Sequence, residues 1–248
     1  MDWSFQLYSA RNFQPWDKVL GMLARHGYRQ VEGYAGCYGD PPGLRAELDK
    51  NGLTMPTGHF SLDILENDFA AASTIAATLG IGLLVCPHLA ADQRPSDAAG
   101  WSAFGARLGR VNRTARAAGL DFAWHNHDFE FKPLADGSLP QDHILSAAPE
   151  TGWEIDVAWV ARGGADPLPW IDRYGQRILA VHVKDIARPG EGVDEDGWSD
   201  VGHGTLDWRA LMQALREKSA ARFYIMEQDN PNDIERFSRR SIEAAQAF

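Results

Sequence analysis

Ionisable side chains stand at or near the ends of several short apolar segments in this 248-residue sequence. They are Glu32, His59, His88, His125, His127, Glu154, Asp156, His182, Lys184, Asp185, Glu227 and Asp229. Charged groups inside apolar segments are costly unless they are paired or bind a metal. Imidazoles mixed with carboxylates suit Zn, Mn, Fe or Co as ligands and suit Ca poorly. The pattern indicates a divalent-metal site. The alternative is structural: strand-end histidines are commonly packing residues, Glu32 would pair with an arginine, and Asp156 would cap a loop.

Strand alternation selects which of these side chains share a face. Residues i and i+2 of a strand point the same way. His125 and His127 therefore share a face, and so do His182 and Lys184. The predicted metal group brings two imidazoles and two carboxylates to one point: His125, Asp156, His182 and Glu227.

Eight segments that could form strands alternate with amphipathic segments that could form helices. The strand segments are 5–8, 29–34, 54–60, 81–87, 121–127, 153–158, 178–184 and 222–228. The helical segments are 16–26, 68–79, 99–118 and 207–217, with Pro15 as the first helical residue and further starts at Asp166-Pro167 and Asn230-Pro231. Such alternation predicts a parallel sheet covered by helices, and eight units match a (β/α)8 barrel. In that fold the chemistry lies at the C-terminal ends of the strands.

Two segments show no regular pattern. Residues 128–152 contain at most a short helix, and residues 186–206 are rich in Gly and Asp. Loops of this length in a compact barrel are usually functional. We expect 186–206 to close over the substrate, with an oligomer contact as the alternative.

Composition excludes several classes of protein. The 24 Lys and Arg against 34 Asp and Glu give a formal net charge of −10, which makes nucleic acid a poor partner. No apolar run is long enough to span a membrane, and the first residues lack a signal-peptide pattern. The two cysteines, Cys37 and Cys86, form no disulfide framework or zinc pair, so we expect a reducing, cytoplasmic location.

Five segments resemble the sugar phosphate isomerase/epimerase family of xylose-isomerase-like barrels. They are WHNHDFEF (124–131), EIDVAWVARGGADP (154–167), RILAVHVKD (177–185), VGHGTLDW (201–208) and YIMEQD (224–229). The family includes inosose dehydratase, hydroxypyruvate isomerase and ketose 3-epimerases. The resemblance covers nearly the whole chain and implies a single TIM-barrel domain over residues 1–248.

The resemblance also implies one bound divalent ion: Mn, Zn, Co, Fe or Mg. The family holds the ion with a Glu, an Asp, a His and a Glu after strands 5 to 8. Asp156, His182 and Glu227 match the last three ligands. His125 stands where ketose epimerases carry the first Glu, so His125 or a water would complete the site. This departure removes one of the two carboxylates that those epimerases use as acid and base.

The implied chemistry starts from the ion as a Lewis acid. A carbonyl and a neighbouring hydroxyl that chelate the ion make the adjacent C–H acidic, and its loss gives an enediolate. Reprotonation isomerises or epimerises the sugar, whereas loss of a β-hydroxyl dehydrates it. We expect His127 to be the base, because an ordinary imidazole has a pKa near neutrality. Glu227 would be both ligand and base, Glu130 would be a substitute base, and Lys184 would stabilise the enediolate oxygen.

The expected substrate is a small non-phosphorylated sugar, ketose or keto-sugar, since the sequence offers little to bind a phosphate. Residues expected to contact it are Glu32, His59, His88, Glu130 and Trp159. The favoured function is a metal-dependent isomerase or epimerase. The alternatives are a lyase of the inosose-dehydratase type, a sugar-binding barrel without turnover and, least favoured, a phosphodiesterase. A homo-oligomer is consistent with the helix-face contacts that barrels commonly make.

Overall fold

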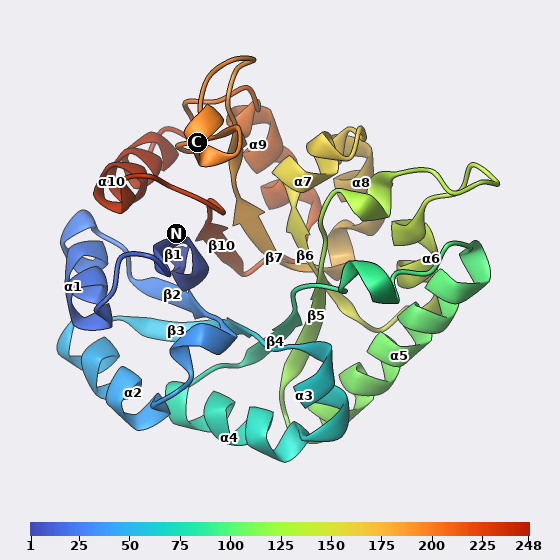
Figure 1. Cartoon of the computed structure of the whole chain (residues 1–248), viewed down its shortest axis with the longest axis horizontal. Coiled ribbons are helices and arrows are strands. Elements are labelled where there is room, and N and C mark those ends of the chain that lie inside the picture. The colour runs from blue at the N-terminus through green and yellow to red at the C-terminus, as the bar shows by residue number, and fades with distance from the viewer.

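Eight short parallel strands close into a barrel in the computed structural model, which describes residues 1–248 (Figure 1). The barrel strands are β1 (Trp3–Gln6), β2 (Gln30–Gly33), β3 (Thr54–His59), β4 (Leu83–Cys86), β5 (Asp121–His125), β6 (Gly152–Asp156), β7 (Ile178–Val183) and β10 (Phe223–Met226). They follow one another around the ring in chain order, and β1 pairs with β10 to close it. The predicted (β/α)8 barrel is therefore confirmed.

Helices form a layer around the outside of this barrel (Figure 1). They are α1 (Trp16–His26), α2 (Pro41–Lys50), α3 (Leu62–Asn67), α4 (Phe69–Leu79), α5 (Ala98–Ala117), α6 (Pro140–Ala147), α7 (Val157–Arg162), α8 (Pro167–Tyr174), α9 (Trp208–Lys218) and α10 (Ile234–Ala245). A small antiparallel ribbon, β8 (Asp185–Ile186) with β9 (Trp198–Ser199), follows β7. None of the helices combines the length and apolar character needed to cross a bilayer.

Most of these helices begin where the sequence supplies an aspartate. Seven of them, α2, α4, α5, α7, α8, α9 and α10, have an N-cap Asp whose carboxylate accepts a backbone N–H of the first turn. This bond satisfies a donor that a helix start otherwise leaves unpaired. Two predicted starts differ from the structure: Pro15 is the N-cap, one residue before α1 begins, and α10 begins after Asp233 rather than at Asn230-Pro231.

The predicted elements are otherwise present. The predicted strand 121–127 ends at His125, and 153–158 ends at Asp156, because α7 begins directly after it. The four predicted helices correspond to α1, α4, α5 and α9, and α8 begins at Pro167 as expected. Helices α2, α3 and α7 were not predicted. Between residues 128 and 152 the only α-helix is the short α6.

The interior of the barrel is apolar at one end and polar at the other. A small buried cluster occupies the apolar end: Leu83, Val85, Ala123, Ala180 and Ile225. Two residues further along three of these strands stand His125, His182 and Glu227, on the same strand faces. The polar side chains therefore lie inside the barrel at its C-terminal end.

Helix α5 packs closely against α6 at Gly105. A Cβ on Gly105 would lie 2.5 Å from the carbonyl oxygen of Ile144 and 3.0 Å from Cβ of Ala147. A Cβ on Gly109, one turn later, would meet Cβ of Ala148 at 3.6 Å, an ordinary contact.

We expect Gly105→Ala to lower the free energy of unfolding by about 1–3 kcal/mol, because α6 must move to make room for the methyl group. Gly109→Ala is the matched control and should be neutral or stabilising by up to about 1 kcal/mol, since Ala is the better helix former. Urea denaturation measures both changes. Equal effects of the two substitutions would contradict this account of the α5–α6 contact.

Candidate active site

A cavity of about 450 Å³ opens at the C-terminal ends of the barrel strands, where (β/α)8 active sites lie. Its wall consists of Gln6, Tyr8, Tyr34, Ala35, His59, Ser61, Pro87, His88, His125, His127, His182, Glu227 and Asp229. Five of these thirteen residues are histidines, and none is Lys or Arg. The other predicted site residues lie elsewhere: Glu32, Glu130, Asp156 and Lys184 are fully buried behind the wall, and Trp159 packs beside His127.

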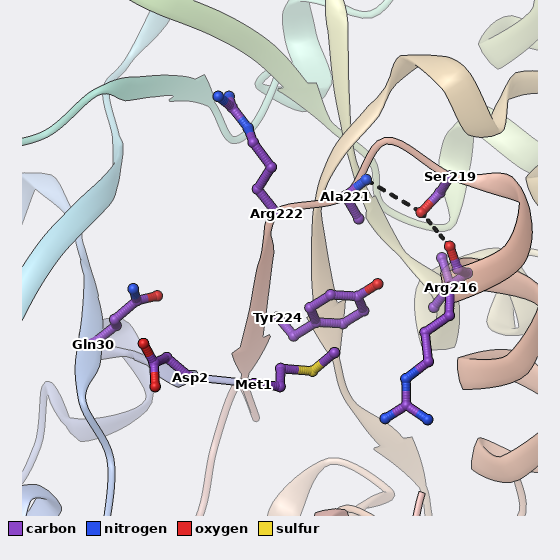
Figure 2. Close-up of a pocket in the computed structure, with 9 residues that line it drawn as sticks. Met1, Asp2, Gln30, Arg216, Ser219, Ala221, Arg222 and Tyr224 are labelled. Atoms are coloured by element: carbon purple, nitrogen blue, oxygen red, sulfur yellow. Dashed lines mark hydrogen bonds between the residues drawn. The ribbon is translucent and has the colours of Figure 1, made fainter.

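A second hollow, of about 370 Å³, lies among residues that precede or begin the strands, at the opposite end of the barrel (Figure 2). Its lining includes Asp2, Gln30, Arg216, Arg222 and Tyr224. The lining contains no histidine and no carboxylate pair that could share acid–base work. The cavity at the C-terminal end is therefore the candidate site.

Asp156, His182 and Glu227 converge at the base of this cavity. One ligand atom from each lies within 4.8 Å of those from the other two, and all three residues are buried. Asp156 stands directly opposite His182 in the β6–β7 pairing. Asp156 Oδ2 and His182 Nδ1 are buried without a hydrogen-bond partner. Unpartnered oxygen and nitrogen atoms of this kind fit a divalent transition metal.

Asp156 has the capping role that the sequence offered as the alternative to metal binding. Its Oδ1 accepts the backbone N–H of Trp159 at 2.8 Å and so caps α7, which leaves Oδ2 free. Asn126 fixes the backbone at the same point, because its Oδ1 accepts the N–H of Asp156 at 3.0 Å and the indole N–H of Trp153 at 2.9 Å. Burial raises the pKa of Asp156 to about 7, although the Lys184 ammonium opposes the shift.

Glu32 orients the His182 ring. Glu32 Oε1 lies 2.7 Å from His182 Nε2, and Gln6 donates to the same oxygen at 2.8 Å. A proton on Nε2 would be donated to Glu32, which leaves Nδ1 with its lone pair directed at Asp156. Carboxylates commonly fix a metal-binding histidine in this way. Glu32 was predicted to contact substrate, but it is fully buried and acts on His182 instead.

Lys184 is a buried ammonium among three carboxylates. Its Nζ lies 2.7 Å from Glu227 Oε2 and 4.0 Å from Asp156 Oδ2, and it also pairs with Asp229. Burial would lower the pKa of this amine, but Asp229, Glu227 and Asp156 outweigh it and raise the pKa. Burial and Asp229 raise the pKa of Glu227 to about 8. Lys184 therefore holds the Glu227 carboxylate in position. If a cation bound Glu227, Lys184 would still be paired with Asp229.

A second polar group lies beside the first and centres on Glu154, for which the sequence predicted no specific role. His125 is opposite Glu154 in the β5–β6 pairing, so its Nδ1 lies 3.2 Å from Glu154 Oε2. His59 Nε2 lies 2.8 Å from the same oxygen and 3.1 Å from Glu32 Oε1. Burial would lower the pKa of His59, but Glu32 and Glu154 raise it to about 10. The signal for Glu154 was present in the sequence, since Glu154 shares its strand face with Asp156.

His127 lies just beyond the end of β5, on the cavity wall. Its ring packs against those of His88 and Trp159, each at a centroid distance of 5.3 Å. Burial lowers the pKa of His127 to about 3. The expected pKa near neutrality is therefore wrong, and the imidazole is neutral at and well below pH 7. Glu130 lies under this loop, where its Oε2 accepts the backbone N–H of His127 at 2.9 Å.

Asp185 fastens both ends of the segment 186–206. Its carboxylate accepts five backbone N–H groups at 2.9–3.1 Å, from Ile186, Gly202, Gly204, Thr205 and Leu206. Trp198 is buried in the same segment, with the Arg162 guanidinium 3.4 Å and Lys184 Nζ 4.0 Å from its ring centre. The tip, 188–191, is exposed. The structure thus holds the base of this loop in place, and closure over a substrate stays a prediction.

Comparison with known proteins identifies relatives of this barrel. Residues 20–247 match the family model described as the xylose isomerase-like TIM barrel. An inosose dehydratase from Geobacillus kaustophilus is 23% identical over 197 residues, which cover 68% of this chain and 62% of that protein. The chain spans less than two thirds of the length of the first curated relatives that it matches.

Two solved structures have the same fold. A sugar phosphate isomerase/epimerase from Parabacteroides distasonis gives a TM-score of 0.84 at 21% identity, covering 99% of this chain and 93% of that one. The IolI protein with a bound zinc atom gives a TM-score of 0.78 at 16% identity, covering 100% and 96%.

Asp185→Asn should lower the free energy of unfolding by about 1–3 kcal/mol, because an amide NH2 in place of an oxygen would face N–H donors. Proteolysis within 186–206 should become faster. Asp172→Asn removes an exposed ion pair with Lys218 and is the control, with an expected change below about 0.5 kcal/mol. Unchanged proteolysis in Asp185→Asn would show that other contacts hold the loop.

Glu130 should make stability fall as the pH rises. Burial raises the pKa of Glu130 to about 8, above its ordinary value of 4.5. Between these values the folded chain keeps a proton that the unfolded chain has lost, so this group destabilises the fold by up to about 1.4 kcal/mol per pH unit.

Glu130→Gln should remove this dependence, because the amide oxygen can still accept the His127 N–H. Denaturation at several pH values between 5 and about 8 would measure the difference from wild type. Glu150→Gln, whose side chain is 77% exposed, is the control. A difference between Glu130→Gln and wild type that stays constant with pH would exclude this role.

Proposed function

Because this chain belongs to the xylose isomerase-like TIM barrel family, we propose that it is a divalent-metal-dependent isomerase or epimerase of a small sugar or keto-sugar. The observation that carries the proposal is the convergence of Asp156, His182 and Glu227 at the base of the cavity, with unpartnered atoms on Asp156 and His182. The zinc atom in the IolI structure supports a metal in a barrel of this fold.

The ion would be held by Asp156 Oδ2, His182 Nδ1 and a carboxylate oxygen of Glu227. When bound, it would supply Lewis-acid polarisation of a carbonyl and a neighbouring hydroxyl, which makes the adjacent C–H acidic. Glu32 keeps His182 in the tautomer that presents Nδ1. Lys184, which is off the cavity wall, pairs with Glu227 and also with Asp229.

His127 would accept the proton removed from the substrate carbon. It is neutral, lines the cavity, and its Nδ1 is buried without a hydrogen-bond partner. An imidazole with a pKa of about 3 is a weak base, so transfer depends on a strongly acidified C–H. Glu227 is the alternative base. Glu130 is not supported in this role, because it lies under the loop and off the cavity wall.

The cavity wall suits a neutral polyhydroxylated substrate. Ser61 offers a hydroxyl group, and Tyr8 and Tyr34 offer aromatic surface. A wall without Lys or Arg gives a phosphate group no direct cationic partner. These features support a non-phosphorylated sugar, ketose or keto-sugar.

Dehydration by the same site is the second candidate. It is favoured by the relative named as an inosose dehydratase and by His125 in place of the first carboxylate of the ketose epimerases. The two reactions share proton removal and differ in the fate of the β-hydroxyl. A dehydrated product absorbs in the near ultraviolet, whereas an isomer does not, so product spectra separate them.

The test is solvent-deuterium exchange into a panel of ketoses and keto-inositols. We expect exchange with added Mn²⁺ or Co²⁺ and none after chelation. Glu227→Gln should lose the supporting ion, whereas His127→Asn should keep it and exchange at least about 100-fold more slowly. His143→Asn is the control, since His143 bonds Ser138 outside the cavity. Wild-type exchange in Glu227→Gln or in chelated protein would refute the proposal.

A further inference from the structure

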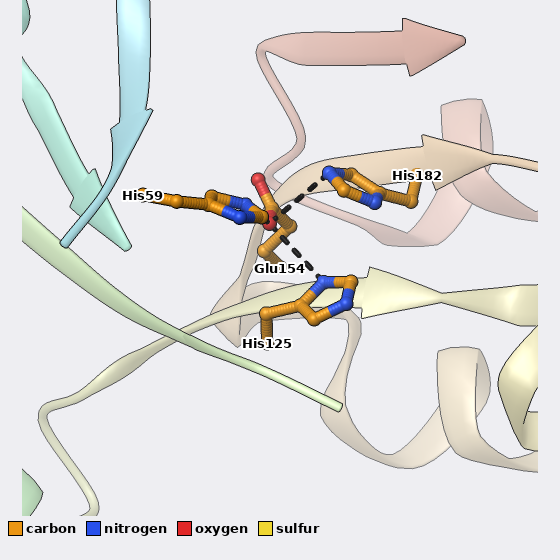
Figure 3. A group of neighbouring side chains, drawn as sticks. All are labelled: His59, His125, Glu154 and His182. Carbon is orange, nitrogen blue, oxygen red and sulfur yellow. Dashed lines mark hydrogen bonds and ion pairs between the residues drawn. The ribbon is translucent and has the colours of Figure 1, made fainter. Parts of the chain in front are cut away.

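We propose a second divalent-cation site beside the first, formed by His59 Nε2, His125 Nδ1 and Glu154 Oε2. It goes beyond the proposed function, which uses the ion at Asp156, His182 and Glu227. Figure 3 shows His59, His125 and His182 gathered around the Glu154 carboxylate. All four side chains are buried, and one ligand atom from each lies within 4.8 Å of the others.

The spacing of the donor atoms fits a small metal ion. Oε2 of Glu154 lies 2.8 Å from His59 Nε2, 3.2 Å from His125 Nδ1 and 3.3 Å from His182 Nε2. Ligand atoms bonded at about 2.0–2.1 Å in a tetrahedral site lie about 3.3 Å from one another. The two nitrogens of the proposed site, His59 Nε2 and His125 Nδ1, therefore stand at nearly the separations from this oxygen that a shared ion would impose.

Hydrogen bonding alone leaves this group incomplete. His125 Nδ1 and Glu154 Oε1 are buried and have no hydrogen-bond partner, although His125 Nδ1 is only 3.2 Å from Glu154 Oε2. The nitrogen is near the oxygen without the alignment of an N–H donor. A lone pair of His125 Nδ1 directed at a bound ion accounts for this arrangement. Without an ion, these two buried polar atoms would lack partners, which costs free energy of folding.

Two buried carboxylates face this group. Glu32 and Glu154 are both fully buried, and His59 Nε2 lies 3.1 Å from Glu32 Oε1 and 2.8 Å from Glu154 Oε2. A divalent ion would take the place of the protons that neutralise these carboxylates in its absence.

The two sites would not compete for His182. Its Nε2 is already occupied by Glu32, and its Nδ1 faces the Asp156 group. Three protein ligands then leave one position of a tetrahedral ion open. His59 and His125 line the cavity, so this position would be open to solvent or substrate, as in catalytic zinc sites.

The test is titration of the chelator-stripped full chain with Co²⁺, followed by its visible absorption and by elemental analysis after gel filtration. We expect two ions per chain in wild type. Glu154→Gln should bind only the ion of the first site, Glu227→Gln only that of the second, and the double variant neither. Glu191→Gln, an exposed carboxylate, is the control and should bind two.

The outcomes separate this site from the proposed function. One ion in wild type that Glu227→Gln removes would overturn the second site and leave the proposed function standing. Two ions in Glu154→Gln would also overturn it. Loss of one ion in Glu154→Gln, with no loss in Glu227→Gln, would support the second site and refute the first. His59→Gln provides a second variant if Glu154→Gln unfolds, with circular dichroism as the folding check, and should likewise lose one ion.

Discussion

Charge balance in a nearly dry space is the constraint on which the rest of this structure depends. Glu32, Glu154 and Asp156 have no solvent exposure, and Glu227 is only 4% exposed. Two basic side chains lie among them: His59 between Glu32 and Glu154, and Lys184 beside Glu227 and Asp229. Loss of one partner from a buried pair typically costs about 3–5 kcal/mol, because the other charge stays buried. The contacts that shape the site and the contacts that stabilise the barrel interior are therefore the same.

His182 connects the two halves of this charge network. One ring nitrogen contacts Glu32 from β2, which is in turn held by Gln6 from β1, and the other faces Asp156 from β6. Strands on opposite sides of the barrel thus determine which nitrogen is available as a ligand. The β1–β2 pairing, in which Gln6 is opposite Glu32, therefore contributes to the orientation of His182 as well as to the sheet.

The sequence predicted the barrel because eight apolar segments alternate with amphipathic ones. It also predicted that His125, Asp156, His182 and Glu227 would meet at a common sheet edge; the last three do, whereas His125 lies in the group around Glu154. It could not predict the partner of His125, since strand register decides it: His125 is opposite Glu154, whereas Asp156 is opposite His182. Nor could it predict that Lys184 is fully enclosed or that His127 has a low pKa, because both depend on side chains from distant segments that exclude water.

The contacts of Asp185 determine where the chain can tolerate insertions during evolution. Lys184 and Asp185 are adjacent in sequence, but their side chains point in different directions. Lys184 points into the barrel, and Asp185 accepts hydrogen bonds from both ends of the following loop. An insertion of one residue before them would exchange their directions and disrupt both. Between the gripped ends, the exposed tip around Pro189 and Gly190 carries no such restriction, and lengthening a loop whose ends are already held costs little. Insertions at this tip can therefore change the length of the loop while the buried side chains inside the barrel are left unaltered.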